Sequence, residues 1–220
     1  MAAVNETIVR EYFELHDLLV RQFRKHVAPA GREDDDIDFF VFNPQLRSRA
    51  DEMPFVLGSD DMPFIHRAIV VIKAWHSEVF SPALLNHALE LFKFLEKRIF
   101  QQAVRDFGHE GGLLKILIVP ALPQEKPARD QSIAILRSKG IDAVISYRTM
   151  LAELVSRVEA SRNYQKSDLL QTLRILKNYD LLKEPQLELF KAKPQRRKSA
   201  NAKTAEPVAQ QANGKSVEAK

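Results

Sequence analysis

The stretch "RAIVVIKAWHSE" (residues 67–78) decides the fold. Residues 68–72 are apolar and mostly small or β-branched, which is typical of a strand buried on both faces of a sheet. Lys73 follows them directly, although burying an ammonium group is costly unless it is paired or faces a cleft. We therefore predict a strand over residues 68–75. Lys73 should lie at its polar rim, either extending to water or facing a site.

The segments around this strand alternate between strand-like and helix-like patterns. Further strands are expected at 37–44, 113–122 and 141–147, and helices at 5–25, 81–107, 129–140, 149–162 and 167–182. Asn5, Ser81 and Ser167 are the expected N-caps of the first, second and last of these helices. Strands this apolar need helices on both faces of their sheet. The sequence therefore predicts an α/β protein with a mixed or parallel β-sheet flanked by helices. A helical hairpin over residues 148–182 is expected at its C-terminal end.

Charge divides the 220 residues into two parts. Residues 191–220 contain eight Lys and Arg against two Asp and Glu, a net charge of +6, so the total of +4 leaves about −2 on residues 1–190. Segment 191–220 also has almost no large apolar residue, and it cannot offset the entropy lost on ordering. We expect a single α/β domain over residues 1–190 and a disordered basic tail over residues 191–220.

Several classes of protein and site are excluded. The chain has no cysteine, so it has no disulfide, thiolate metal site or cysteine nucleophile. Charged residues interrupt the N-terminal stretch before a signal-peptide core could form, and no apolar run reaches the roughly 20 residues that span a bilayer. No glycine-rich phosphate loop, GxSxG or HExxH sequence occurs. We therefore expect a soluble cytoplasmic protein that does not interact with membranes.

One acidic residue stands inside an apolar strand pattern. Asp38 begins the strand-like stretch "DFFVFN", whereas Asp34, Asp35 and Asp36 belong to a loop of the kind that is usually solvated. We predict that this strand and the strand over 68–75 are adjacent and central in the sheet. Asp38 and Lys73 should then open toward one cleft, which would explain why the apolar strand carries a lysine at its end.

The order of elements around Asp38 and Lys73 resembles the PD-(D/E)XK nuclease superfamily. In that layout a helix and an aspartate-bearing strand are followed by a strand ending in acid-x-lysine, then by helix and strand units; the similarity covers residues 5–148. The resemblance implies a restriction-endonuclease-like fold and metal-dependent hydrolysis of phosphodiester bonds. It also implies Asp38 as the first acid, Lys73 as the lysine, and Glu14 as the acid that some members place on the first helix.

The implied chemistry needs two carboxylates. They hold Mg²⁺ against a phosphate, the metal lowers the pKa of a bound water, and the lysine orients that water. Here Val71 occupies the position of the acid two residues before Lys73. Glu78, just past the strand, is the candidate second ligand for Mg²⁺ beside Asp38, and Glu90 and His76 are alternatives. Glu78 and Glu90 are also consistent with ordinary exposed positions, and a lone histidine beside a tryptophan is more often a packed or hydrogen-bonded residue than a metal ligand.

The expected partner is nucleic acid, with DNA ranked ahead of RNA. Basic residues near the C-terminus, Arg196, Arg197 and Lys198, are candidates for sequence-independent contacts to phosphate, although solubilising disorder explains them equally well. Two functions remain open: an active nuclease with a rearranged acid set, and a catalytically inactive nuclease-fold interaction module. A Rossmann-like binder of small molecules is a third possibility, ranked last because the phosphate loop is missing.

Overall fold

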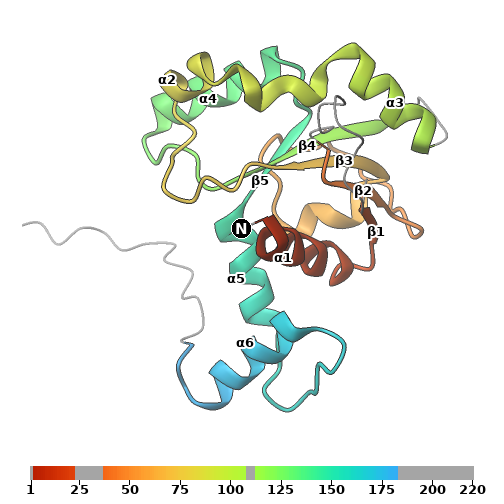
Figure 1. Ribbon diagram of the computed structural model, residues 1–220, viewed down its shortest axis with the longest axis vertical. Helices are drawn as coiled ribbons and strands as arrows, with labels where there is room; N and C mark the ends of the chain where they lie inside the picture. The colour runs from red at the N-terminus through yellow and green to blue at the C-terminus, as the bar shows by residue number, and fades with distance from the viewer. Residues whose placement is uncertain (1, 23–36, 108–111, 183–220) are drawn as a thin grey trace, which may run out of the picture. The chain divides into compact units, whose positions relative to one another are not determined.

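In the computed structural model, which describes residues 2–22, 37–107 and 112–182, the strands form one mixed sheet (Figure 1). The strands, in their order across the sheet, are β1 (Leu19–Gln22), β2 (Phe39–Phe42), β3 (Arg67–Ile72), β4 (Leu113–Val119) and β5 (Ala143–Ser146). β2 is antiparallel to both β1 and β3, whereas β3, β4 and β5 are parallel to one another. This confirms the predicted α/β class and mixed sheet, and it confirms that β2 and β3 are adjacent.

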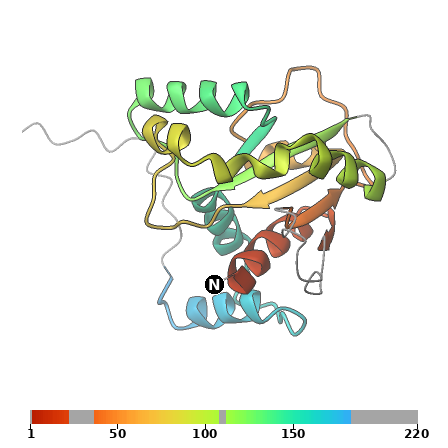
Figure 2. The same ribbon diagram turned by 45° about the horizontal axis from the view of Figure 1, so that its top comes forward.

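Helices cover both faces of the sheet (Figure 2). One face carries α1 (Ala2–Glu14), the 3₁₀ segment η1 (Ser59–Phe64), α5 (Tyr147–Arg157) and α6 (Asp168–Asn178). The other carries α2 (Pro82–His87), the 3₁₀ segment η2 (Leu89–Leu95), α3 (Lys97–Phe107) and α4 (Lys126–Ser138). We call the apolar cores under these two layers the first and the second cluster, respectively. Both crossover connections that join the parallel strands lie on the second side.

Strand β3 is buried on both faces, as its apolar sequence predicts. Ala68 and Val70 belong to the first cluster, Ile69 and Val71 belong to the second, and all four side chains are 0% exposed. Successive side chains of a strand point to opposite faces, so a strand between two helical layers needs apolar residues at every position. β3 is the middle strand of the sheet, with a neighbouring strand on each side and a helical layer on each face.

The first predicted helix was too long. α1 ends at Glu14 rather than near residue 25, and Asp17 adopts a left-handed conformation with a φ of 62° that reverses the chain. Leu19 and Val20 then pair with β2 in strand β1. Their spacing from the helical apolar residues fits a continued helix equally well, but pairing with the apolar β2 strand provides the cross-strand contacts that a longer helix could not make. Asn5 lies inside α1, not at its N-cap.

The helix predicted over residues 81–107 is broken into α2, η2 and α3. Ser81 caps α2 as predicted, because its Oγ accepts a hydrogen bond from the Leu84 N–H at 3.3 Å. Leu85 and Phe94, both 0% exposed in the second cluster, lie nine residues apart. In one unbroken α-helix they would project from opposite sides, since each residue turns the helix by about 100°. The breaks allow both to face the sheet.

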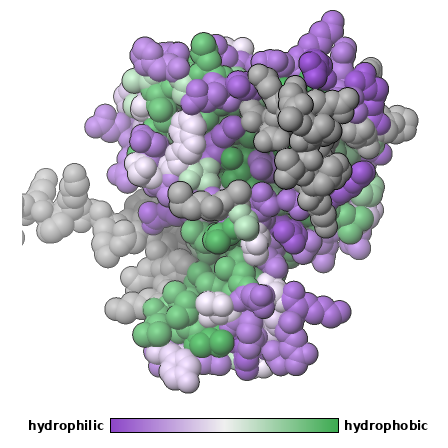
Figure 3. Space-filling model, in the orientation of Figure 1, coloured by the Kyte–Doolittle hydropathy of each residue, from purple (hydrophilic) through white to green (hydrophobic). Residues whose placement is uncertain are grey.

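The predicted C-terminal hairpin is present as α5 and α6. The Ser167 Oγ accepts a hydrogen bond from the Leu170 N–H at 3.2 Å, which confirms Ser167 as the N-cap of α6, and it donates one to the Glu11 carboxylate at 2.6 Å. Leu170 packs in the first cluster, but Ile175 is 46% and Leu181 69% exposed. Figure 3 shows green, apolar side chains in the lower part of the molecule, where Figure 1 places α6. Leu181 therefore does not belong to the buried core.

Replacing Ser167 by alanine is expected to lower the free energy of unfolding by about 1–2 kcal/mol, because the helix loses its cap and the Glu11 carboxylate loses a donor. Urea denaturation followed by circular dichroism measures the change. The matched control is Ser161→Ala, at an exposed position of the neighbouring loop, where a change within about 0.5 kcal/mol is expected. Equal stabilities of the two variants would show that the cap is unimportant.

Two predictions from the sequence concern segments that the structure does not describe. The basic tail over residues 191–220 and the acidic residues 34–36 lie outside the described residues. Within residues 2–22, 37–107 and 112–182, no helix has both the length and the apolar character needed to cross a membrane.

A buried histidine predicts how stability depends on pH. The side chain of His16 is 5% exposed, and its ring lies 5.0 Å from that of Tyr12. Burial lowers the pKa of His16 below its ordinary value of 6.5, and the positive charge of Arg157 lowers this pKa further, whereas Glu153 acts in the opposite direction. The folded protein therefore holds this imidazole neutral at neutral pH.

The unfolded chain binds a proton at His16 more readily than the folded chain does. The stability linked to this residue is therefore complete above the unfolded pKa of about 6.5 and is lost as the pH falls from there toward the lowered folded pKa. We expect the free energy of unfolding to fall between pH 7.5 and 5.5. A His16→Phe variant, which keeps an aromatic contact with Tyr12, should lose part of that dependence. An unchanged slope in this variant would contradict the assignment.

Candidate functional site

The predicted residues Asp38 and Lys73 belong to one edge of the sheet. β2 is antiparallel to β3, so the residue that precedes β2 lies beside the end of β3. The Asp38 Oδ2 accepts a hydrogen bond from the backbone N–H of Ile72 at 2.6 Å, and the Lys73 N–H donates to the Ile118 carbonyl at 3.1 Å. The parallel strands β3, β4 and β5 all end at this edge, the position where open α/β sheets usually bind ligands.

A local irregularity positions Asp38. Its N–H donates to the Val70 carbonyl at 3.0 Å, although the residue paired with Val70 in the register is Phe39. Asp38 and Phe39 thus both face Val70 of β3, as in a β-bulge, which is a common way to redirect a side chain at the end of a strand. The half-buried Asp38 carboxylate is thereby turned onto the end of β3.

Three further polar residues complete this edge. Tyr147, which begins α5 directly after β5, is 3% exposed, and its ring meets that of His76 edge-on at 4.6 Å. The His76 Nε2 lies 3.0 Å from the Oδ1 of Asn5, on α1. We call Asp38, Lys73, His76, Tyr147 and Asn5 the strand-end site. It gathers residues from α1, the start of β2, the end of β3 and the start of α5.

The electrostatics of the strand-end site keep the Tyr147 phenol neutral. Burial raises the pKa of Tyr147 above its ordinary value of 10, and the negative charge of Asp38 raises it further. Among the described residues, the Tyr147 hydroxyl has no hydrogen-bond partner. A buried hydroxyl without a partner costs about 1–3 kcal/mol, so this group is available to donate to or accept from a ligand that enters the edge. The sharing of one cleft by Asp38 and Lys73 stays a prediction.

The described residues do not fit the Mg²⁺ site that the resemblance implies. Val71 is 0% exposed and packs in the second cluster with Phe40. Glu78 lies on an exposed turn, where its N–H donates to the Trp75 carbonyl at 2.8 Å, and Glu90 is also exposed. Within residues 2–22, 37–107 and 112–182, no group of three or more His, Asp or Glu residues is placed to hold a metal ion. Mg²⁺ prefers six oxygen ligands, several of them from carboxylates or phosphates.

The remaining predicted residues lie elsewhere. Glu14 ends α1 and, with Glu11, lines a hollow against loop 163–167. Burial raises the pKa of Glu14, and the charge of Glu11 raises it further, whereas Arg10 lowers it. The helical rise of 1.5 Å per residue puts Glu14 about 13 Å along α1 from Asn5, so the structure does not bring it to the strand-end site. The basic residues Arg196, Arg197 and Lys198 lie outside the described residues.

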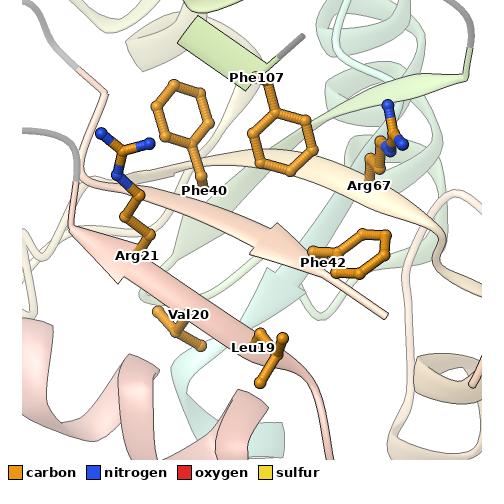
Figure 4. Close-up of a pocket in the computed structure, with 7 residues that line it drawn as sticks. All are labelled: Leu19, Val20, Arg21, Phe40, Phe42, Arg67 and Phe107. Atoms are coloured by element: carbon orange, nitrogen blue, oxygen red, sulfur yellow. The ribbon is translucent and has the colours of Figure 1, made fainter. Parts of the chain in front are cut away.

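The sequence analysis missed a pocket over β1, β2 and the start of β3. This cavity of about 370 Å³ is lined by Leu19, Val20, Arg21, Phe40, Phe42, Arg67 and Phe107 (Figure 4). In Figure 4, the rings of Phe40 and Phe107 stand between the side chains of Arg21 and Arg67 on one side of the strands. We call it the arginine–phenylalanine pocket. No sequence signal joins its residues, because the strand register alone pairs Arg21 with Phe40 and Phe42 with Arg67.

Comparisons of the chain with protein-family models, with curated proteins and with solved structures give no match.

Proposed function

We propose that this protein binds nucleic acid through a nuclease-like core that does not cleave it. The observation that carries the proposal is the contrast between two neighbouring positions of the sheet edge. Asp38 stands beside the end of β3, where the resemblance requires an acid, and its carboxylate accepts the Ile72 N–H at 2.6 Å. Val71, which replaces the second acid, is fully buried among apolar side chains.

The topology supports the nuclease-like part of the proposal. A helix, α1, precedes an antiparallel strand series that ends with Asp38 and Lys73 at one edge of neighbouring strands, and a helical crossover then leads to a parallel strand. This is the element order of the resemblance. Strand β1, which replaces the second half of the expected first helix, is an additional antiparallel strand between that helix and β2.

The small number of possible metal ligands supports the proposal that the protein does not cleave nucleic acid. One carboxylate is a poor site for Mg²⁺, which needs several oxygen ligands, and one Asp38 oxygen is already engaged by a backbone donor. Glu78, the candidate second Mg²⁺ ligand named from the sequence, lies on an exposed turn. The strand-end site therefore has the groups of a polar binding site: a carboxylate, an ammonium, an imidazole and a neutral phenol. Binding with no cleavage needs only these groups.

A combined binding and cleavage assay tests the proposal. Fluorescein-labelled 20-mers of single-stranded DNA, duplex DNA and single-stranded RNA are titrated with the protein at 50 and 200 mM salt, and anisotropy is measured. The same mixtures are incubated with Mg²⁺, with Mn²⁺ or with EDTA and separated on a denaturing gel. We expect binding that weakens with salt, because phosphate contacts release counterions, and no product with any metal.

Single substitutions locate the interaction. Lys73→Ala is expected to weaken binding of the labelled 20-mer several-fold, whereas Lys93→Ala, which removes the same charge from an exposed position of η2, is expected to leave the affinity within twofold. Metal-dependent cutting that Asp38→Ala abolishes would contradict the proposal and establish the active nuclease instead. Failure of all three nucleic acids to bind at 50 mM salt would exclude both functions.

A further inference from the structure

We infer that the arginine–phenylalanine pocket binds a nucleotide, with the phosphate held by Arg21 and Arg67 and the base placed against the phenylalanine rings. The ligand is either a free nucleotide or one unit of a single strand, since both present the same anion and the same flat ring. The inference rests on the proposed function only where the nucleotide belongs to a strand. The pocket is separate from the strand-end site and contains none of its residues.

Among the described residues, the two positive charges of the pocket have no neutralising partner. Its described lining includes Arg21 and Arg67 and no acidic residue. Among the described residues neither guanidinium takes part in a salt bridge, and the Arg67 Nε is buried without a hydrogen-bond acceptor. A guanidinium offers up to five N–H donors in a planar fork that matches phosphate oxygens. An anionic group that enters the pocket would meet two such forks.

Among the described residues, aromatic rings and not a carboxylate contact the Arg67 guanidinium. Its Cζ lies 5.7 Å from the ring centroid of Phe42 and 5.7 Å from that of Phe107. Phe107 also packs against Phe40, with centroids 5.0 Å apart and planes tilted by 39°. Cation–π contact orients a guanidinium but leaves its charge in place, so Arg67 is both fixed and available to an anion. The ordering entropy of the Arg67 side chain is thus lost before a ligand binds.

The chemistry of the lining selects a nucleotide among anions. A purely ionic ligand would not use the three phenylalanines of the lining, and a purely apolar ligand would leave the charges of Arg21 and Arg67 without an anion. Stacking of a base on an aromatic side chain contributes about 1–3 kcal/mol, and arginine beside aromatic residues is a recurrent element of single-strand binding. The volume of about 370 Å³ lies within the range of roughly 300–1,000 Å³ that small-ligand sites occupy.

Calorimetric titration of the full chain with AMP, adenosine and inorganic phosphate tests whether the pocket binds a free nucleotide. Anisotropy with labelled dA8 tests whether the protein binds a nucleotide within a single nucleic-acid strand. AMP is expected to bind at least tenfold more tightly than adenosine or phosphate. Arg21→Gln and Arg67→Gln should each weaken AMP binding at least tenfold, and Arg67→Lys should also weaken it, because an ammonium lacks the planar fork. Arg21 is exposed, so its variant should fold even if substitutions at Arg67 lower stability.

The matched control is Arg98→Gln, which removes an exposed arginine from α3, the helix that carries Phe107. Equal AMP affinities of this variant and Arg21→Gln would overturn the inference, as would phosphate binding as tightly as AMP. AMP binding without dA8 binding would support the pocket as a site for a free nucleotide and contradict the proposed function. Binding of dA8 that neither pocket arginine affects, without AMP binding, would overturn the inference and leave the proposed function standing.

Discussion

Replacing Val71 by glutamate is expected to lower the free energy of unfolding by about 3–5 kcal/mol and to create no Mg²⁺ site. The substitution restores the acid-x-lysine spacing of the resemblance. Its carboxylate would, however, enter the second cluster, where Val71 is 0% exposed among apolar side chains such as Phe40 and Leu85. A charge buried there has no partner, so it either destabilises the fold or takes up a proton. Urea denaturation and calorimetry with MgCl₂ measure the two effects.

Val79→Glu provides the control for this substitution. Val79 is 47% exposed shortly after β3, so the same change there should alter the free energy of unfolding by no more than about 0.5 kcal/mol. A stable Val71→Glu protein that binds Mg²⁺ would contradict the expectation. It would show that position 71 and Asp38 do share one cleft, and it would favour a site inherited from an active nuclease.

The parts of the fold that sequence predicts well are those where one physical requirement dominates. The consecutive apolar residues of β3 can be buried only in a strand with layers on both faces, so its burial on both faces follows from composition alone. Ser81 and Ser167 precede helices for a similarly local reason, since each hydroxyl accepts an otherwise unpaired N–H. Local requirements of this kind are present in the sequence itself.

The parts that were mispredicted depend on competition between distant segments. Leu19 and Val20 extend the helical spacing of α1, and only the presence of β2 as a pairing partner makes them a strand. The helix expected over residues 81–107 breaks because Leu85 and Phe94 must both reach the sheet, a demand that appears only when the sheet is in place. The periodicity of apolar residues within one segment does not reveal such requirements.

The candidate site, like the fold, could be predicted from the sequence only in part. Asp38 stands out in the sequence as the acidic residue inside an apolar strand, and the adjacency of β2 and β3 brings it to the end of β3. Tyr147 and Asn5 could not be predicted, because they reach His76 only through the packing of α1 and α5 on the first face. The arginine–phenylalanine pocket depends on strand register, which one sequence does not specify for short strands.

Deleting residues 191–220 is expected to weaken binding of a single-stranded DNA 20-mer by at least tenfold at 50 mM salt without changing the unfolding temperature. The segment contributes a net charge of +6, whereas residues 1–190 carry about −2, so most of the attraction to phosphate is removed. For single strands the logarithm of affinity falls with the logarithm of salt with a slope of about −0.7 per neutralised phosphate. Losing up to six such contacts should reduce this slope by as much as about 4. Anisotropy titrations between 50 and 200 mM salt measure it.

A second variant separates charge from length in this deletion. Replacing the eight Lys and Arg of residues 191–220 by glutamine keeps the length of the chain, and it should reproduce the effect of the deletion on both affinity and salt slope. A deletion that weakens binding while the glutamine variant does not would assign the effect to contacts other than phosphate. Unchanged affinity in both variants would assign the whole interaction to residues 1–190. Arg21, Arg67 and Lys73 would then have to bind the phosphates although residues 1–190 carry a net charge of about −2.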